Sequence, residues 1–135
     1  KGITQILVFK NYNKNELWLK NDAQKIIKRN GLEKSLAVVV DYIERDNDFF
    51  KIKPYVYFKK GLRYEIVRET SCGSATTAVG IFLSNLTNKS IKYQKVIQPS
   101  GDSLYVSVKK IGNRFESYLS GKVKILYQGP FDLNN

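Results

Sequence analysis

The feature that most constrains the fold of this chain is an apolar segment at residues 75–86. It contains no proline, and it does not alternate apolar with polar residues as a half-buried strand would. Val79, Ile81, Phe82 and Leu83 cannot all lie on one face of a helix. Because a helix that is apolar on every side is usually a buried helix, we predict a buried helix from Ala75 to Leu86, enclosed by other elements.

Most of the remaining chain has the pattern of short strands, rich in β-branched and aromatic residues. The predicted strands cover residues 3–9, 36–43, 49–58, 62–67, 91–97, 104–108, 114–119 and 122–127. A second helix is predicted from Asp22, which can cap its N-terminus, to Asn30. Only a sheet offers enough surface to bury the apolar helix on all sides. We therefore predict an α+β fold, in which an antiparallel sheet curls into a barrel around one central buried helix.

Composition limits the chemistry and the partners. The chain has 135 residues, the size of one domain, with one cysteine and no histidine. It therefore lacks the commonest general base and the commonest metal ligand. The net charge is +11, but many lysines alternate with apolar residues, as on the exposed faces of strands. No apolar stretch reaches the ~18–20 residues of a transmembrane helix. We expect no metal, no nucleic-acid partner, no membrane and, from the cysteine content, a reducing cytoplasmic compartment.

The first residue is Lys1, and the sequence contains no methionine. A complete translation product would begin with methionine, so we expect the chain to be a processed product or a piece of a longer protein.

Cys72 lies immediately before the predicted helix and is followed by Gly73 and Ser74. The first amides of a helix have no partner within it, and the helix dipole adds partial positive charge there. Both effects favour a thiolate, and the amides of Gly73, Ser74 and Ala75 can seat a carboxylate or a phosphate. The alternative is an inert thiol, because a lone cysteine is often a small buried apolar residue.

Several cysteine chemistries are excluded. A phosphatase loop would need arginine at the position of Ala78, and a thioredoxin-type motif would need cysteine at Ala75. A papain-like site needs histidine, and a metal cluster needs more soft ligands. Proton transfer at carbon remains, since a thiolate can act as the base without a cofactor. Inversion at Cα needs an acid and a base on opposite faces, so another residue type or a missing segment must supply the partner.

Three segments resemble the diaminopimelate epimerase family. Ser71-Cys72-Gly73-Ser74-Ala75 is similar to the family's Cys-Gly-Ser/Thr-Gly-Ala motif, which opens the central helix of its C-terminal domain. Residues 100–106 (SGDSLYV) resemble its Gly-Gly-x-Leu-x-Val strand, and residues 119–129 resemble its closing hairpin. Residues 2–9 lie where the family's C-terminal half begins. The resemblance covers nearly the whole chain but only one of the family's two pseudo-symmetric domains.

The resemblance implies a cofactor-independent, two-base racemase or epimerase of an amino acid. Residues 1–135 would be the C-terminal domain, with a second catalytic cysteine in an absent N-terminal domain. Cys72 would be one acid/base, and the backbone of Gly73, Ser74 and Ala75 would hold the substrate carboxylate. Glu69, with Glu65 as the minor alternative, would bind the substrate amine. This fragment alone is expected to be inactive, and the oligomeric state stays open, a homodimer included.

Two departures from the family pattern bear on the substrate. The family's Gly-Asn-Pro-His is replaced by residues 2–5 (GITQ), and its Thr-Asn-Val-Asn-Phe by residues 35–39 (SLAVV). The lost asparagines hold polar groups of diaminopimelate, so the chain resembles more closely the branch that racemises histidine for staphylopine-type metallophores. The alternatives are a diaminopimelate epimerase, a non-catalytic β-rich module that binds an anion, and a phenazine-biosynthesis-type isomerase with a carboxylate base.

Overall fold

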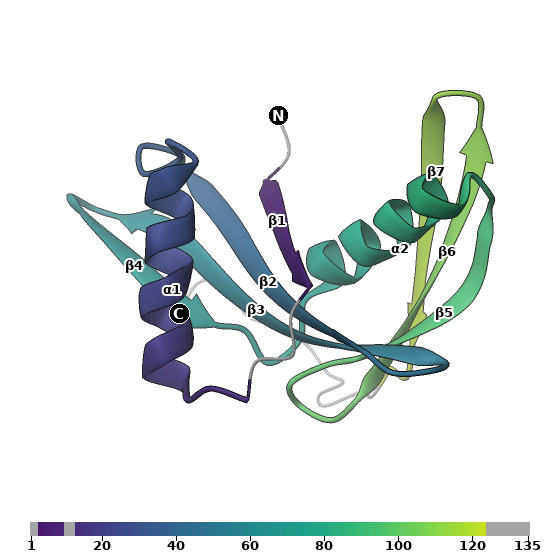
Figure 1. The fold of residues 1–135 in the computed structure, drawn as a ribbon, viewed down its shortest axis with the longest axis horizontal. Helices are drawn as coiled ribbons and strands as arrows, with labels where there is room; N and C mark the ends of the chain where they lie inside the picture. Colours follow the sequence, from purple (N-terminus) through teal and green to yellow (C-terminus); the bar gives the residue numbers. More distant parts are fainter. Residues whose placement is uncertain (1–2, 10–12, 124–135) are drawn as a thin grey trace, which may run out of the picture.

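The computed structural model describes residues 3–9 and 13–123, which form one curled sheet with a helix on each side (Figure 1). The two helices are α1 (Glu16–Arg29) and α2 (Gly73–Thr87). The strands are β1 (Thr4–Phe9), β2 (Ala37–Arg45), β3 (Phe49–Lys60), β4 (Arg63–Arg68), β5 (Ile91–Ile97), β6 (Ser103–Ile111) and β7 (Arg114–Gly121). The predicted positions of α2 and of these strands are confirmed to within a few residues. The predicted strand at 122–127 falls almost wholly outside the described residues.

The sheet is mixed, so the prediction of an antiparallel sheet is wrong at two pairings. Its seven strands run in the order β1-β2-β3-β5-β6-β7, with β4 paired to β3 beside this path. β1 is parallel to β2 and β3 is parallel to β5, while the other pairs are antiparallel. Parallel neighbours need a long crossover connection. Helix α1 forms the first crossover, and β4 together with α2 forms the second.

Strand β3 changes partner along its length, and this leaves a gap in the sheet next to the start of α2. Its residues 49–51 pair with β5, and its residues 55–60 pair with β4. Pro54 lies between these two stretches and pairs with neither β4 nor β5. Its missing N–H therefore removes no hydrogen bond between strands on that edge. Its carbonyl accepts a hydrogen bond from the amide of Glu69 at 3.0 Å. The chain therefore leaves β4 at this gap and passes through Cys72 into α2.

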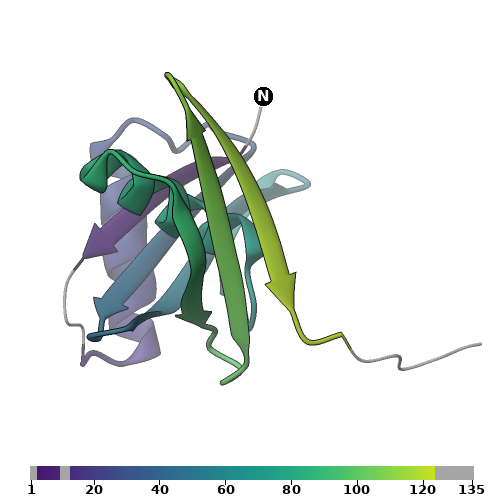
Figure 2. The same ribbon diagram turned by 90° about the vertical axis from the view of Figure 1, so that its right-hand side faces the viewer.

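Helix α2 lies on the concave side of the sheet, between β1 and the β5–β7 strands (Figures 1 and 2). Its buried stripe consists of Ala75, Thr76, Val79, Gly80 and Ser84. A Cβ at Gly80 would lie 2.6 Å from the Val106 side chain, so glycine permits this close approach. The opposite side of the helix is open among the described residues, where Phe82 is 37 % and Leu86 is 66 % exposed.

The described sheet is therefore a half-barrel, and a helix buried on all sides is not confirmed. The prediction rested on the apolar character of every face of α2. The helix instead packs through one stripe of mostly small residues, with Ile81 and Leu83 partly buried against the same core. Phe82, on the less covered side, contacts the Phe9 ring with centroids 4.5 Å apart. Neither of the helices in the described ranges is long and apolar enough to cross a membrane.

Helix α1 covers the other face of the sheet and begins earlier than predicted. Asn15 caps it, since its side-chain oxygen accepts a hydrogen bond from the Trp18 amide at 2.8 Å. The predicted cap, Asp22, lies within the helix and accepts a hydrogen bond from the Tyr42 hydroxyl at 2.8 Å. The sequence prediction missed the first two turns of α1 because its cap, Asn15, lies in a polar segment that has the composition of a loop.

Strand β2 separates two hydrophobic cores. Its residues Val38, Val40 and Tyr42 pack in the core beneath α1. Val39 and Ile43 belong to the core on the other face, which also contains Cys72, Ala75 and Val79. Since side chains alternate along a strand, Asp41 points to the same face as Cys72.

Candidate active site

Cys72 is the N-cap residue of α2, with extended backbone angles φ −141° and ψ 104°. Its carbonyl accepts the first helical hydrogen bond, from the Thr76 amide at 3.1 Å. No side chain caps the helix, and within the described part of the chain the amides of Gly73, Ser74 and Ala75 have no acceptor. The structure thus has the free amides at the helix start that the sequence predicted.

The sulfur of Cys72 lies at the edge of the core. The residue is 9 % exposed and contacts the cluster formed by α2 and the sheet. Its Sγ lies 3.3 Å from the hydroxyl of Ser74, which is itself exposed to solvent. Packing on one side and a hydroxyl on the other give the thiol a fixed position beside the open amides.

Gln98 positions the start of the helix, although the sequence prediction did not single it out. It is 3 % exposed, and its Oε1 accepts a hydrogen bond from the Cys72 amide at 2.9 Å. Its Nε2 donates to the Thr76 hydroxyl at 3.0 Å and to the Val96 carbonyl at 3.2 Å. The available signal was a polar residue between an apolar strand and a Pro-Ser-Gly turn, which is the setting of many surface residues as well.

The structure separates the two candidate glutamates. Glu69 lies in the short link between β4 and Cys72, is partly exposed, and its carboxylate has no partner among the described residues. Glu65 lies within β4 opposite Phe58, and its carboxylate forms an ion pair with Lys60 at 3.5 Å. Four residues of extended strand span about 13 Å. Glu69 is therefore the glutamate beside the helix start, and Glu65 belongs to the β3–β4 hairpin.

The segments that resemble the family meet at this point. The Ser100 amide donates a hydrogen bond to the Thr70 carbonyl at 2.9 Å, so the loop before β6 holds the link to Cys72. On β7, the Leu119 methyl would lie 3.1 Å from a Cβ at Gly73, so only a glycine fits there without displacement. From β1, the side-chain amide of Gln5 donates to the Ser74 hydroxyl at 3.2 Å. Residues far apart in the sequence thus fix the start of α2.

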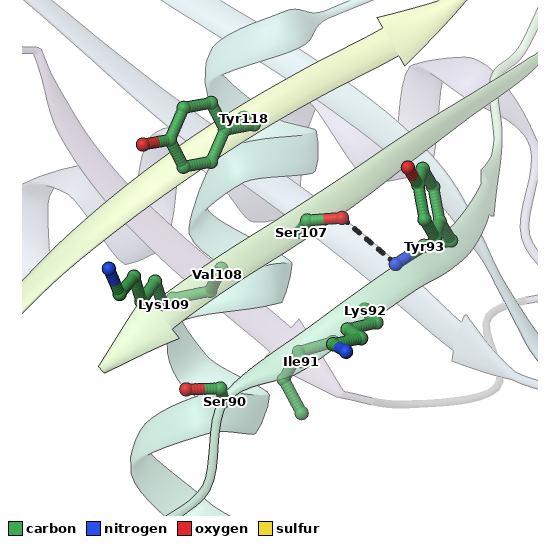
Figure 3. A pocket seen from close by; sticks show the side chains of 8 residues that line it. All are labelled: Ser90, Ile91, Lys92, Tyr93, Ser107, Val108, Lys109 and Tyr118. Carbon is green, nitrogen blue, oxygen red and sulfur yellow. Dashed lines mark hydrogen bonds between the residues drawn. The ribbon is translucent and has the colours of Figure 1, made fainter.

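We also searched the described residues for metal-ligand groups and for hollows away from Cys72. They contain no group of three or more His, Cys, Asp or Glu side chains that could hold a metal ion. A hollow of about 480 Å³ lies along β5–β7, where the Tyr93 amide donates to the Ser107 hydroxyl at 3.0 Å (Figure 3). Tyr118 and Lys109 also line it, but none of the predicted site residues does.

No protein-family model matches the sequence. Two curated proteins from two strains of Fusobacterium nucleatum subsp. nucleatum do match it, and each is named histidine racemase. They are 38 % identical to this chain over 84 and 87 residues. Each match covers 62 % of this chain and 28 % of the relative, so the chain spans less than a third of the relatives' length. We therefore identify the chain as a relative of proteins named histidine racemase, which confirms the predicted kinship with an amino-acid racemase.

Proposed function

We propose that the whole protein is a cofactor-independent amino-acid racemase in which Cys72 acts as one of two acid/base residues. The observation that carries this proposal is the position of the thiol. Cys72 is the N-cap residue of a helix whose first three amides have no partner in the described residues, and the Ser74 hydroxyl lies 3.3 Å from its sulfur. A sulfur that can take up a proton therefore lies beside a seat for an anion.

The proposed reaction is a proton exchange at the substrate Cα. The Cys72 thiolate removes the Cα proton, and the electron pair of the C–H bond delocalises onto the substrate carboxylate. The amides of Gly73, Ser74 and Ala75 stabilise that added negative charge, because helix N-termini bind anions. A second acid returns a proton from the opposite face, and the configuration is inverted. The Glu69 carboxylate binds the substrate ammonium group.

The second acid is proposed to come from another part of the protein. This chain contains one cysteine and no histidine, and the matched relatives are more than three times as long as the matched segment. We place a second cysteine in an N-terminal domain related to this one by pseudo-symmetry. The chain of residues 1–135 by itself should then not racemise any amino acid, because half of the site is missing.

Histidine is the proposed substrate. The relatives' name supports it, and so does the segment Ser35–Val39, which lacks the asparagines that hold diaminopimelate in the family it resembles. The product would be D-histidine for a metallophore, made in the cytoplasm. Diaminopimelate epimerisation is the second candidate, and a β-rich module that binds an anion without catalysis is the third.

Deuterium exchange at Cα tests the function. The full-length protein is incubated in D₂O with L-histidine, LL-diaminopimelate and a panel of other amino acids, and Cα deuterium is measured by NMR or mass spectrometry. We expect incorporation into histidine at a rate well above that of the rest of the panel. Exchange into diaminopimelate instead would support the second candidate, and no exchange into any amino acid would support the non-catalytic module.

A further inference from the structure

A buried polar pair lies behind Cys72 and Ser74. Asp41 is fully buried, and neither of its carboxyl oxygens has a hydrogen-bond partner among the described residues. The side-chain oxygen of Gln5 is also buried, and the same residues offer it no partner. Buried polar atoms are nearly always hydrogen-bonded, so unpartnered oxygens on two adjacent strands require a physical explanation.

The register places these oxygens on one face. Gln5 of β1 pairs with Val39 of β2, and Leu7 pairs with Asp41. Leu7 and Val39 both pack in the core that contains Cys72. Gln5 and Asp41 are therefore diagonal neighbours on this face, about 8 Å apart from the spacing of adjacent strands and the rise of two residues. A glutamine and an aspartate side chain can bridge that separation directly or through one water.

The protonation state of Asp41 makes such a link workable. Burial raises the pKa of Asp41 from 3.8 to about 8, and a weaker effect of the Lys53 backbone amide opposes it. That amide does not lie in hydrogen-bond geometry with the carboxyl group. No charged side chain contributes to the shift. Among the described residues of the hydrophobic core on this face, Cys72 is the one with a titratable side chain. At neutral pH the carboxyl group is therefore mostly protonated, and it can donate one hydrogen bond.

We propose that Asp41 and Gln5 are positioning residues that aim the Ser74 hydroxyl hydrogen at the sulfur of Cys72. The Asp41 hydroxyl donates to Gln5 Oε1, and this holds the Gln5 amide with its Nε2 toward Ser74. Gln5 Nε2 then donates to Ser74 Oγ at 3.2 Å. Since Ser74 Oγ accepts that bond, its own hydrogen is free to donate to Sγ, which lies 3.3 Å away. A hydrogen bond donated to sulfur favours the thiolate over the thiol.

The direction of the hydrogen bonds from Asp41 to Cys72 depends on the protonation state of Asp41. If Asp41 were ionised, it could only accept, and the Gln5 amide would turn its donor toward the carboxylate. The Gln5 oxygen would then accept the Ser74 hydroxyl hydrogen, and Ser74 would offer Cys72 only an acceptor. A neutral Asp41 thus supports the thiolate, and an ionised Asp41 supports the thiol.

The test is the pH dependence of alkylation of Cys72 by iodoacetamide in the full-length protein, followed on the Cys72 peptide by mass spectrometry. Asp41→Val removes the donor, and we expect the alkylation midpoint to rise by about one pH unit, since hydrogen bonds to charged groups are strong. Asp41→Asn keeps an N–H donor at the same place and should retain the wild-type midpoint. Asp48→Val, at an exposed aspartate, is the matched control.

A wild-type midpoint in Asp41→Val, or equal shifts in Asp41→Val and Asp41→Asn, would overturn the proposal. Should Asp41→Val fail to fold, Gln5→Leu tests the same link and is expected to raise the midpoint too; an unchanged midpoint in that variant would also overturn it. The inference rests on Cys72 being the reactive group of the proposed function. Alkylation needs no substrate, however, so failure of the link and failure of racemase activity are measured separately.

Discussion

The buried carboxyl group of Asp41 should make the stability of the protein fall as the pH rises. Its pKa is about 8 in the folded chain and 3.8 in the unfolded reference. Between these values the folded state binds a proton that the unfolded state has lost, so each pH unit costs about 1.4 kcal/mol of unfolding free energy. The loss between pH 4 and pH 7 is then about 4 kcal/mol, a large part of the stability of a small domain.

Asp41→Asn removes this titration and keeps the shape of the side chain. The neutral carboxyl group and the amide each carry one donor group at the same place, so any constant offset between them applies at every pH. We expect the variant and the wild type to differ little at pH 4, and the variant to gain about 4 kcal/mol relative to the wild type by pH 7. The other carboxyl groups titrate equally in both proteins and cancel in the difference.

The assay is urea denaturation at each pH from 4 to 8, with the free energy of unfolding taken from midpoint and slope. Asp48→Asn, at an exposed position in the β2–β3 turn, is the matched control and should give the same profile as the wild type. If the difference between Asp41→Asn and the wild type stayed constant from pH 4 to pH 8, Asp41 would not be held neutral by burial, and this reasoning would fail.

Three further substitutions test the packing and the site. Gly80→Ala places a Cβ 2.6 Å from the Val106 side chain, and such overpacking should cost about 1–3 kcal/mol in urea denaturation, whereas Ala78→Gly would show only the helix-propensity loss of about 1 kcal/mol. Gln98→Leu leaves the Cys72 amide and the Thr76 hydroxyl without their partner and should cost about 1–3 kcal/mol; no loss would mean that Gln98 does not hold the helix start. Glu69→Gln in the full-length protein should raise the KM for histidine more than Glu65→Gln does, and the reverse order would assign the amine to Glu65.

The sequence pattern predicted the parts of the fold that depend on local signals. The apolar run after Cys72 identified α2, and the β-branched segments located the strands. The parallel pairings could not be predicted in this way, because they depend on where a crossover returns the chain. The start of α1 was missed because its cap, Asn15, lies in a polar segment. Asp22 is a residue type that often caps helices, but here its carboxylate accepts a hydrogen bond from Tyr42.

The residues of the candidate site also differ in whether a local sequence pattern predicts them. Cys72 and the amides after it follow from one short motif and the physics of a helix N-terminus. Gln98 acts through hydrogen bonds to residues distant in the sequence, and the role proposed for Asp41 also depends on distant residues. A single polar residue in or after an apolar strand does not reveal such partners. The burial of Asp41 on the Cys72 face follows from the alternation of β2 between two cores, which requires the folded sheet to be known.

The proposed reaction depends on the sulfur of Cys72 exchanging the Cα proton. The most direct test compares the full-length protein with its Cys72→Ser variant in D₂O, with L-histidine as substrate and Cα deuterium as the readout. Ser117→Ala, at an exposed position on β7, serves as the control. We predict that Cys72→Ser lowers racemisation by at least about 100-fold, while the control keeps the wild-type rate. Racemisation by Cys72→Ser at the wild-type rate would contradict the account.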